Sequence, residues 1–142
     1  MKRYIKSDTF GISDEDDIVR AKFAKATDTS PRVLARLAED PNEQIRGIVA
    51  RNSSTPDEIR WKLAHDPDPM VRCDVLNYQY TLPEKYFELL VEDPDTDVRD
   101  TVACRLDAPV DVLRKLLDDE NKHIRAMADE TLNYVLRARG GN

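Results

Sequence analysis

The chain has 142 residues, of which 40% are hydrophobic and 35% charged, and its formal net charge is -6. This length and composition suit one domain with a hydrophobic core and a highly charged surface, and no apolar run approaches the roughly 20 residues that cross a bilayer. The acidic balance argues against a general nucleic-acid binder, because an acidic protein and the phosphate backbone repel each other at long range.

The cysteines and the first residues predict a cellular location. Cys73 and Cys104 are too few for a disulfide framework and lack the close spacing of a zinc or redox site. Residues 1–6 carry basic side chains with no apolar stretch behind them, so we expect neither a signal peptide nor a membrane anchor. The sequence therefore predicts a cytoplasmic protein with free thiols, no metal and no cofactor.

One pattern recurs along the chain: an Asp is followed six residues later by an Arg. The pairs are Asp14/Arg20, Asp40/Arg46, Asp66/Arg72, Asp93/Arg99 and Asp119/Arg125. Successive pairs are 26 or 27 residues apart. A fixed period of this length is typical of small units that bury their apolar faces by stacking on copies of themselves.

The chain divides into units as follows. Residues 1–12 do not match the repeat and predict an N-terminal cap in which Ile5, Phe10 and Ile12 cover the apolar end of the stack. Residues 13–28 predict a partial unit. Complete units are expected at 29–53, 54–80, 81–106 and 107–136, and a tail at 137–142.

Each unit predicts two short helices, one on each side of the repeated Asp. In the unit 54–80, Ile59 and Leu63 lie four residues apart before Asp66, and Val71 and Val75 lie four apart after it. This spacing places apolar side chains on one face of a helix. The pattern therefore indicates helices and gives no sign of strands.

Capping residues and prolines separate the helices. Thr55 with Glu58, and Thr81 with Glu84, predict capping boxes at the start of a unit's first helix. Between the two helices an Asp-Pro step recurs in three units. This step ends one helix and opens the next, because a proline disfavours the helical conformation of the residue before it.

These features carry a family resemblance. The segment 54–59 (Ser-Thr-Pro-Asp-Glu-Ile) running into 63–72 resembles the leucine-rich repeat variant family, and the Asp-to-Arg spacing also resembles HEAT repeats, in which these two residues form a ladder. The resemblance covers residues 13–136. It implies an all-α, right-handed helical-repeat solenoid (α-α superhelix) of about four to five two-helix units of ~26 residues.

We interpret the Asp/Arg column as a structural ladder. The planar fork of Arg can bind an Asp of its own unit together with a carbonyl or an Asp of the next unit, whereas a functional charge stripe is the alternative. The predicted ladder residues are Asp40, Arg46, Asp66, Arg72, Asp93, Arg99, Asp119 and Arg125.

Positions that differ between units are the candidates for binding. Eleven and twelve residues after the Asp, second helices carry non-repeating side chains, which the resemblance places on the concave side. Together with Lys25, the candidates are Arg51, Asn77, Tyr78 and Arg105. They predict a mildly basic groove with one aromatic ring, and a solvated helix face is the alternative.

Two further aromatic residues are candidate binding residues. Trp61 is the only Trp, in a column that is mostly polar elsewhere; such a residue anchors an interface or else covers the apolar edge of a neighbouring unit. Tyr80 follows Tyr78 in the longest loop between units, and loops that depart from a repeat are suited to partner contacts.

The sequence contains no catalytic constellation, so we expect no enzyme. The predicted function is a non-catalytic scaffold that binds another protein or peptide through its curved surface, as a monomer or a weak end-to-end dimer and without membrane contact. The alternative is a nucleic-acid-binding helical-repeat protein with a basic concave groove.

Overall fold

All regular elements in the described part of the chain are helices. The computed structural model describes residues 16–78 and 80–140, and these residues form nine helices and no strand, which confirms the all-α expectation. The bounds are α1 (Asp17–Lys25), α2 (Pro31–Leu37), α3 (Glu43–Arg51), α4 (Asp57–Leu63), α5 (Pro69–Leu76), α6 (Glu84–Leu90), α7 (Thr96–Ala103), α8 (Val110–Leu116) and α9 (Lys122–Gly140). Asp14 and the cap predicted at 1–12 lie outside the described residues.

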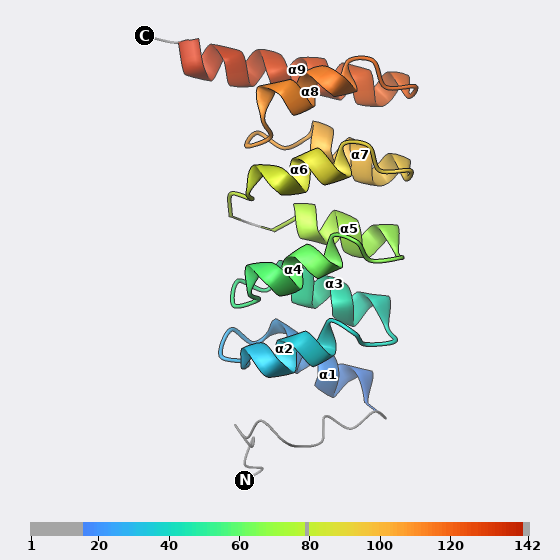
Figure 1. Cartoon of the computed structure of the whole chain (residues 1–142), viewed down its shortest axis with the longest axis vertical. Coiled ribbons are helices and arrows are strands. Elements are labelled where there is room, and N and C mark those ends of the chain that lie inside the picture. Colours follow the sequence, from blue (N-terminus) through green and yellow to red (C-terminus); the bar gives the residue numbers. More distant parts are fainter. Residues whose placement is uncertain (1–15, 79, 141–142) are drawn as a thin grey trace.

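The helices follow one another along the long axis of the molecule (Figure 1). Each odd-numbered helix packs against the next odd-numbered helix, from α1 through α9. The even-numbered helices pack mainly on the odd-numbered helices beside them in the chain. The odd-numbered helices therefore form a close row, and the even-numbered helices cover one side of it.

The core lies between these two rows. The apolar positions that the spacing identified in 54–80 are buried: Leu63 is 1% exposed, and Val71 and Val75 are 0% exposed. Leu34 and Phe87 of the even-numbered helices are also fully buried. Burial of such side chains is the main favourable contribution to folding.

The odd-numbered helices α3, α5 and α7 begin with side-chain caps. Asn42 accepts the backbone N–H of Gln44 at 2.9 Å, and Asp68 accepts that of Met70 at 2.8 Å. Asp95 caps α7 in the same way. Asn and Asp are favoured at this position because they satisfy an N–H group that has no partner within the helix.

The capping boxes predicted at Thr55 and Thr81 are wrong. Pro56 and Pro83 occupy the N-cap positions of α4 and α6, and neither helix has a side-chain cap bond. Thr55 Oγ1 instead donates to the carbonyl of Val49 at 2.7 Å, at the end of the preceding helix.

The last helix is longer than the others. α9 has 19 residues, and its second half buries Leu132 and Val135. Residues 137–140, predicted as part of a tail, are helical. The exposed positions along α9 include Arg125, Asp129 and Asn133, four residues apart. A polar outer stripe of this kind is expected at the end of a stack.

The ladder forms, but its ion pairs join each of Arg20, Arg46, Arg72 and Arg99 to the Asp of the next unit. Nε and Nη2 of Arg72 donate to the two carboxylate oxygens of Asp93, each at 2.8 Å. Nη1 of Arg72 donates to the backbone carbonyl of Asp66, the Asp of its own unit, at 2.7 Å. The sequence interpretation also allowed an ion pair between Arg72 and Asp66 of the same unit. That ion pair does not form, because Asp66 presents its backbone carbonyl to Arg72.

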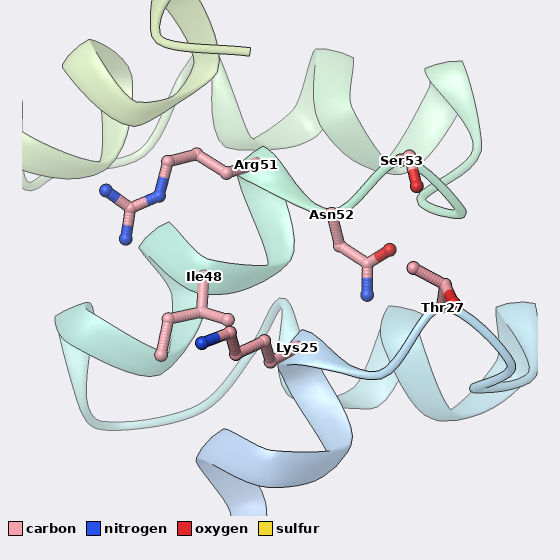
Figure 2. Close-up of a pocket in the computed structure, with 6 residues that line it drawn as sticks. All are labelled: Lys25, Thr27, Ile48, Arg51, Asn52 and Ser53. Carbon is pink, nitrogen blue, oxygen red and sulfur yellow. The ribbon is translucent and has the colours of Figure 1, made fainter. Parts of the chain in front are cut away.

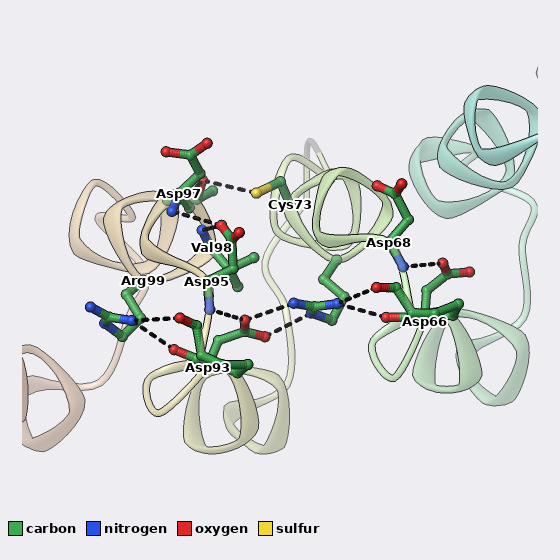
Figure 3. A network of polar contacts seen from close by, with 12 residues as sticks. Asp66, Asp68, Cys73, Asp93, Asp95, Asp97, Val98 and Arg99 are labelled. Carbon is green, nitrogen blue, oxygen red and sulfur yellow. Dashed lines mark hydrogen bonds and ion pairs between the residues drawn. The ribbon is translucent and has the colours of Figure 1, made fainter.

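The same arrangement recurs along one edge of the stack, and Figure 3 shows the part of it around Asp66, Asp93 and Arg99. The distances from Nε to the carboxylate of the next unit are 2.7 Å for Arg20–Asp40, 2.8 Å for Arg46–Asp66 and 2.8 Å for Arg99–Asp119. The carboxylates also accept a backbone N–H two residues on, as Asp93 does from Asp95 at 2.9 Å.

The ladder contacts are withdrawn from water. Asp93 is 7% exposed and Arg99 is 8% exposed. Arg125, in contrast, is exposed, and Nη1 binds the carbonyls of Asp119 and Glu120 at 2.6 and 3.0 Å. Among the described residues, Arg125 has no following unit and no Asp of a next unit to bind.

We expect Arg72→Ala to lower the free energy of unfolding by about 2 to 4 kcal/mol, because it leaves the buried carboxylate of Asp93 without its cation. Arg125→Ala is the matched control, since Arg125 makes the same type of carbonyl contact but no ion pair to a next unit. Urea unfolding measures both variants. Equal losses for Arg72→Ala and Arg125→Ala would contradict a stabilising role of the ladder ion pair.

The pKa of the Asp119 carboxyl lies below its usual range, chiefly because Arg99 donates hydrogen bonds to the ionised form. The pKa of an Asp carboxyl in an unfolded chain is about 3.9. The stabilisation by ionised Asp119 is therefore present above that value and is lost as the pH falls through it toward the lower folded pKa.

We accordingly expect Asp119→Asn to be less stable than the wild type at neutral pH, with a difference that shrinks below about pH 4. Asp118→Asn is the control, since Asp118 is exposed and adjacent in sequence. Urea unfolding at a series of pH values measures the difference. A constant difference over this pH range would argue against the contribution of the Asp119 ion.

Candidate binding site

The odd-numbered helices present one varied, accessible surface. Positions five and nine after the repeated Asp, such as Ile45 and Val49, are buried in the core. Positions four, eight and eleven lie on a different side of each helix. They hold Ile18, Lys22 and Lys25 of α1; Gln44, Ile48 and Arg51 of α3; Met70, Asp74 and Asn77 in and after α5; Asp97, Thr101 and Cys104 in and after α7; and His123, Met127 and Glu130 of α9. We call this set the odd-helix face.

Side chains of this face contact the neighbouring odd-numbered helices, from α3 through α9. Arg51 Nη1 of α3 lies 3.1 Å from Asp74 Oδ1 of α5. Thr101 Oγ1 of α7 donates to Cys73 Sγ of α5 at 3.6 Å. His123 Nε2 of α9 lies 3.5 Å from Asp100 Oδ1 of α7.

A hollow opens on this face between the carboxyl ends of α1 and α3. It has a volume of about 490 Å³ and is lined by Lys25, Thr27, Ile48, Arg51, Asn52 and Ser53. Figure 2 shows the side chains of Lys25 and Arg51 extending toward the same side of the hollow, with Ile48 between them. Two exposed cations thus flank a half-buried apolar side chain.

Gly47 sets the position of Asp74 beside this hollow. A Cβ atom on Gly47 would lie 2.0 Å from Asp74 Oδ2, so the absence of a side chain there lets the carboxylate lie against α3. Burial raises the pKa of Asp74, and the nearby guanidinium of Arg51 opposes this shift. Arg51, predicted as a binding residue, is still half exposed, with 50% of its side chain accessible.

The twelfth position after the Asp binds the preceding unit. Asn52 Nδ2 donates to the carbonyls of Ala24 and Ala26 at 2.6 and 3.0 Å. The equivalent Arg105 donates through Nη1 to the carbonyls of Leu76 and Tyr78 at 2.7 and 2.9 Å. Both side chains thus connect units along the edge of the stack opposite the ladder.

Arg105, which follows α7, contacts Tyr78 and Tyr80 of the loop between α5 and α6. Arg105 Nη2 donates to the carbonyl of Tyr80 at 3.2 Å and also pairs with Asp107. The ring centroids of Tyr78 and Tyr80 are 5.2 Å apart, and the guanidinium of Arg60 lies 3.8 Å from the Tyr78 centroid. Arg105 is therefore used within the chain, whereas Tyr80 remains 54% exposed.

Asn77 and Trp61 are placed separately from that loop cluster. Asn77 is exposed at the end of α5, on the odd-helix face. Trp61 of α4 is half-buried, with its ring centroid 5.2 Å from that of Tyr86 and Lys85 Nζ 4.8 Å from the ring. These contacts with α6 match the interpretation in which Trp61 covers the edge of the next unit.

Several residues of the face were not identified from the sequence. Ile48, Met70 and Asp74 occupy positions four and eight after the Asp, and the sequence reasoning considered only positions eleven and twelve as a groove. Variation between units could have identified them, because positions four and eight differ from unit to unit just as positions eleven and twelve do. Met70 is 59% exposed and Ile18 is 68% exposed, which is unusual for large apolar side chains.

Three comparisons with known proteins add no assignment. Family models, curated proteins and solved structures give no match to this chain. Within residues 16–78 and 80–140, no group of three or more His, Cys, Asp or Glu side chains is placed to hold a metal ion. No helix in the same ranges has both the length and the apolar character needed to span a membrane. The resemblance to helical-repeat families stays a prediction.

We expect Gly47→Ala to lower the pKa of Asp74 toward its ordinary value, because the new Cβ displaces the carboxylate from its half-buried place on α3. The pKa is measured by NMR titration of the carboxyl carbon. Gly140→Ala is the control, since a Cβ there meets no atom within 4 Å. An unchanged Asp74 pKa in Gly47→Ala would contradict the role assigned to Gly47.

Proposed function

We propose that this protein is a non-catalytic scaffold that binds another protein or peptide on its odd-helix face. As part of the same proposal, its helices form a right-handed solenoid of about four to five two-helix units of ~26 residues. We also propose a cytoplasmic location and a monomer or weak end-to-end dimer.

The observation that supports this proposal is that structural positions and surface positions of the repeat differ in how much they vary between units. The ladder and core positions repeat from unit to unit, whereas the odd-helix face carries a different side chain in almost every unit. Exposed Ile18 and Met70 lie on this face among charged residues. A mixture of apolar and charged side chains around a hollow is suited to a polypeptide, which offers both kinds of group.

The nucleic-acid alternative rests on the exposed cations Lys25 and Arg51. Two features weaken it. Arg105, which the sequence placed in the same basic groove, donates its hydrogen bonds within the chain. The face also carries Asp74, Asp97 and Glu130, which would repel a continuous phosphate backbone laid along it. We therefore favour a polypeptide partner.

Selection from a random peptide library displayed on phage tests the proposal. Peptides enriched on the wild type are synthesised, and their affinity is measured by fluorescence anisotropy. We expect Lys25→Glu with Arg51→Glu to weaken binding about tenfold, because the hollow loses its cations and gains repulsion. Arg32→Glu is the matched control, since Arg32 is exposed on α2, away from this face.

The nucleic-acid alternative is tested with single-stranded DNA and RNA oligonucleotides at two salt concentrations. Peptide binding that is lost in the double variant, together with weak oligonucleotide binding, supports the proposal. Strongly salt-dependent oligonucleotide binding, without any enriched peptide, would overturn it in favour of phosphate contacts.

A further inference from the structure

The charges of the odd-helix face are ordered along the molecule. The charged residues of α1 and α3 on this face are Lys22, Lys25 and Arg51, all exposed cations. The carboxylates of the face begin with Asp74 in α5 and continue with Asp97 in α7 and Glu130 in α9. One end of the face is thus basic and the other end acidic.

Apolar side chains lie between the two ends. Ile48 of α3 forms part of the hollow, and Met70 of α5 is the most exposed apolar residue of the central helices. Cys73, next to Met70 on the same helix, is buried. The middle of the face therefore offers apolar contact where the sign of the charge changes.

Lys25 at the basic end and Glu130 at the acidic end act separately on a ligand, whereas Arg51 and Asp74 meet where the sign of the charge changes. Packed helices lie about 8 to 10 Å apart, so the four steps from α1 to α9 span roughly 32 to 40 Å. This distance is several times the Debye length of about 8 Å at physiological ionic strength. It matches an extended peptide of about ten to twelve residues, at roughly 3.3 Å per residue.

We propose that the odd-helix face binds one extended polypeptide segment with segregated charges, its acidic residues against α1 and α3 and its basic residues against α7 and α9. The inference rests on the proposed polypeptide-binding function and adds the charge order and the orientation of the partner. Complementary charge patterns fix register and orientation more than they raise affinity.

A second copy of the chain is the competing occupant, since two such faces turned antiparallel would also pair opposite charges. The hollow favours a peptide, because its volume of about 490 Å³ and its Lys25, Ile48 and Arg51 lining suit individual side chains of a single segment. Light scattering over a range of protein concentrations measures whether the chain forms a dimer through this face. A dimer that disappears when Lys25 and Arg51 are changed to Glu would overturn the proposal.

Two synthetic peptides of identical composition test the charge order. One has an acidic block, an apolar centre and a basic block, and the other has the same residues with alternating charges. Fluorescence anisotropy at physiological ionic strength measures both affinities. We expect the segregated peptide to bind about tenfold more tightly, and equal affinities would overturn the inference.

Charge inversion of each end gives a second test. Inverting the basic end (Lys25→Glu with Arg51→Glu) or the acidic end (Asp97→Lys with Glu130→Lys) should each weaken the segregated peptide about tenfold. Inverting both ends should restore binding, since the peptide then fits in the opposite direction. Circular dichroism confirms that each variant is folded. Failure of the combined variant to recover affinity would contradict the proposal.

The orientation can be measured directly through Cys104. This cysteine is exposed at the acidic end of the face, whereas Cys73 is buried, so a nitroxide attaches preferentially to Cys104. We expect NMR signals from the basic block of the bound peptide to broaden, and those of the acidic block to be little affected. Broadening of the acidic block would overturn the assigned orientation. A diamagnetic label is the control.

The outcomes separate this inference from the function on which it rests. If library peptides bind the face but the segregated and alternating peptides bind equally, the inference fails and the scaffold function stands. If no library peptide binds and no defined peptide binds, the proposed function itself fails.

Discussion

The structure depends on one contact between successive units: a guanidinium held between a carbonyl of its own unit and a carboxylate of the next. Arg72 is an example: one edge of its planar guanidinium binds the carboxylate of Asp93, and Nη1 binds the carbonyl of Asp66. A buried ion pair contributes little by itself, since desolvation offsets the attraction. The contact is favourable here because the carboxylate also receives a backbone N–H, from Asp95, and each Asp thereby links a helix junction to the preceding unit.

A second set of contacts holds the opposite edge. Asn52 and Arg105, both twelve residues after the repeated Asp, donate to carbonyls of the preceding unit. The interval from Asp66 to Asp93 is the one that is 27 residues long, and it contains the loop whose carbonyls Arg105 binds. A long, multiply donating side chain therefore follows the longest loop, where more backbone groups need a partner.

Much of this fold could be predicted from the sequence, because the relevant signals are local. The spacing of Leu63, Val71 and Val75 predicts helices and their buried sides without any knowledge of how the units pack on one another. The partner of each Arg could not be predicted, since a side chain six residues beyond an Asp can reach backward along its own unit or forward to the next. Arg105 was assigned to a binding groove for a similar reason: its column holds unlike residues, and only the three-dimensional arrangement shows that its guanidinium satisfies loop carbonyls. Varied positions are thus of two kinds, those that adapt to irregular neighbours and those that face solvent.

That distinction is the physical basis of the role we propose for charge order on the odd-helix face. Both edges of the stack are fixed by hydrogen bonds to backbone groups, so the helices that carry Lys25, Asp97 and Glu130 hold their charges at set separations. A ligand with matching charges then meets a surface that needs little reorganisation, which lowers the entropic penalty of binding. The same charges placed on mobile loops would attract a partner without fixing its direction. In the proposed function, the regular ladder is therefore the physical reason why an irregular face discriminates between ligands of equal composition.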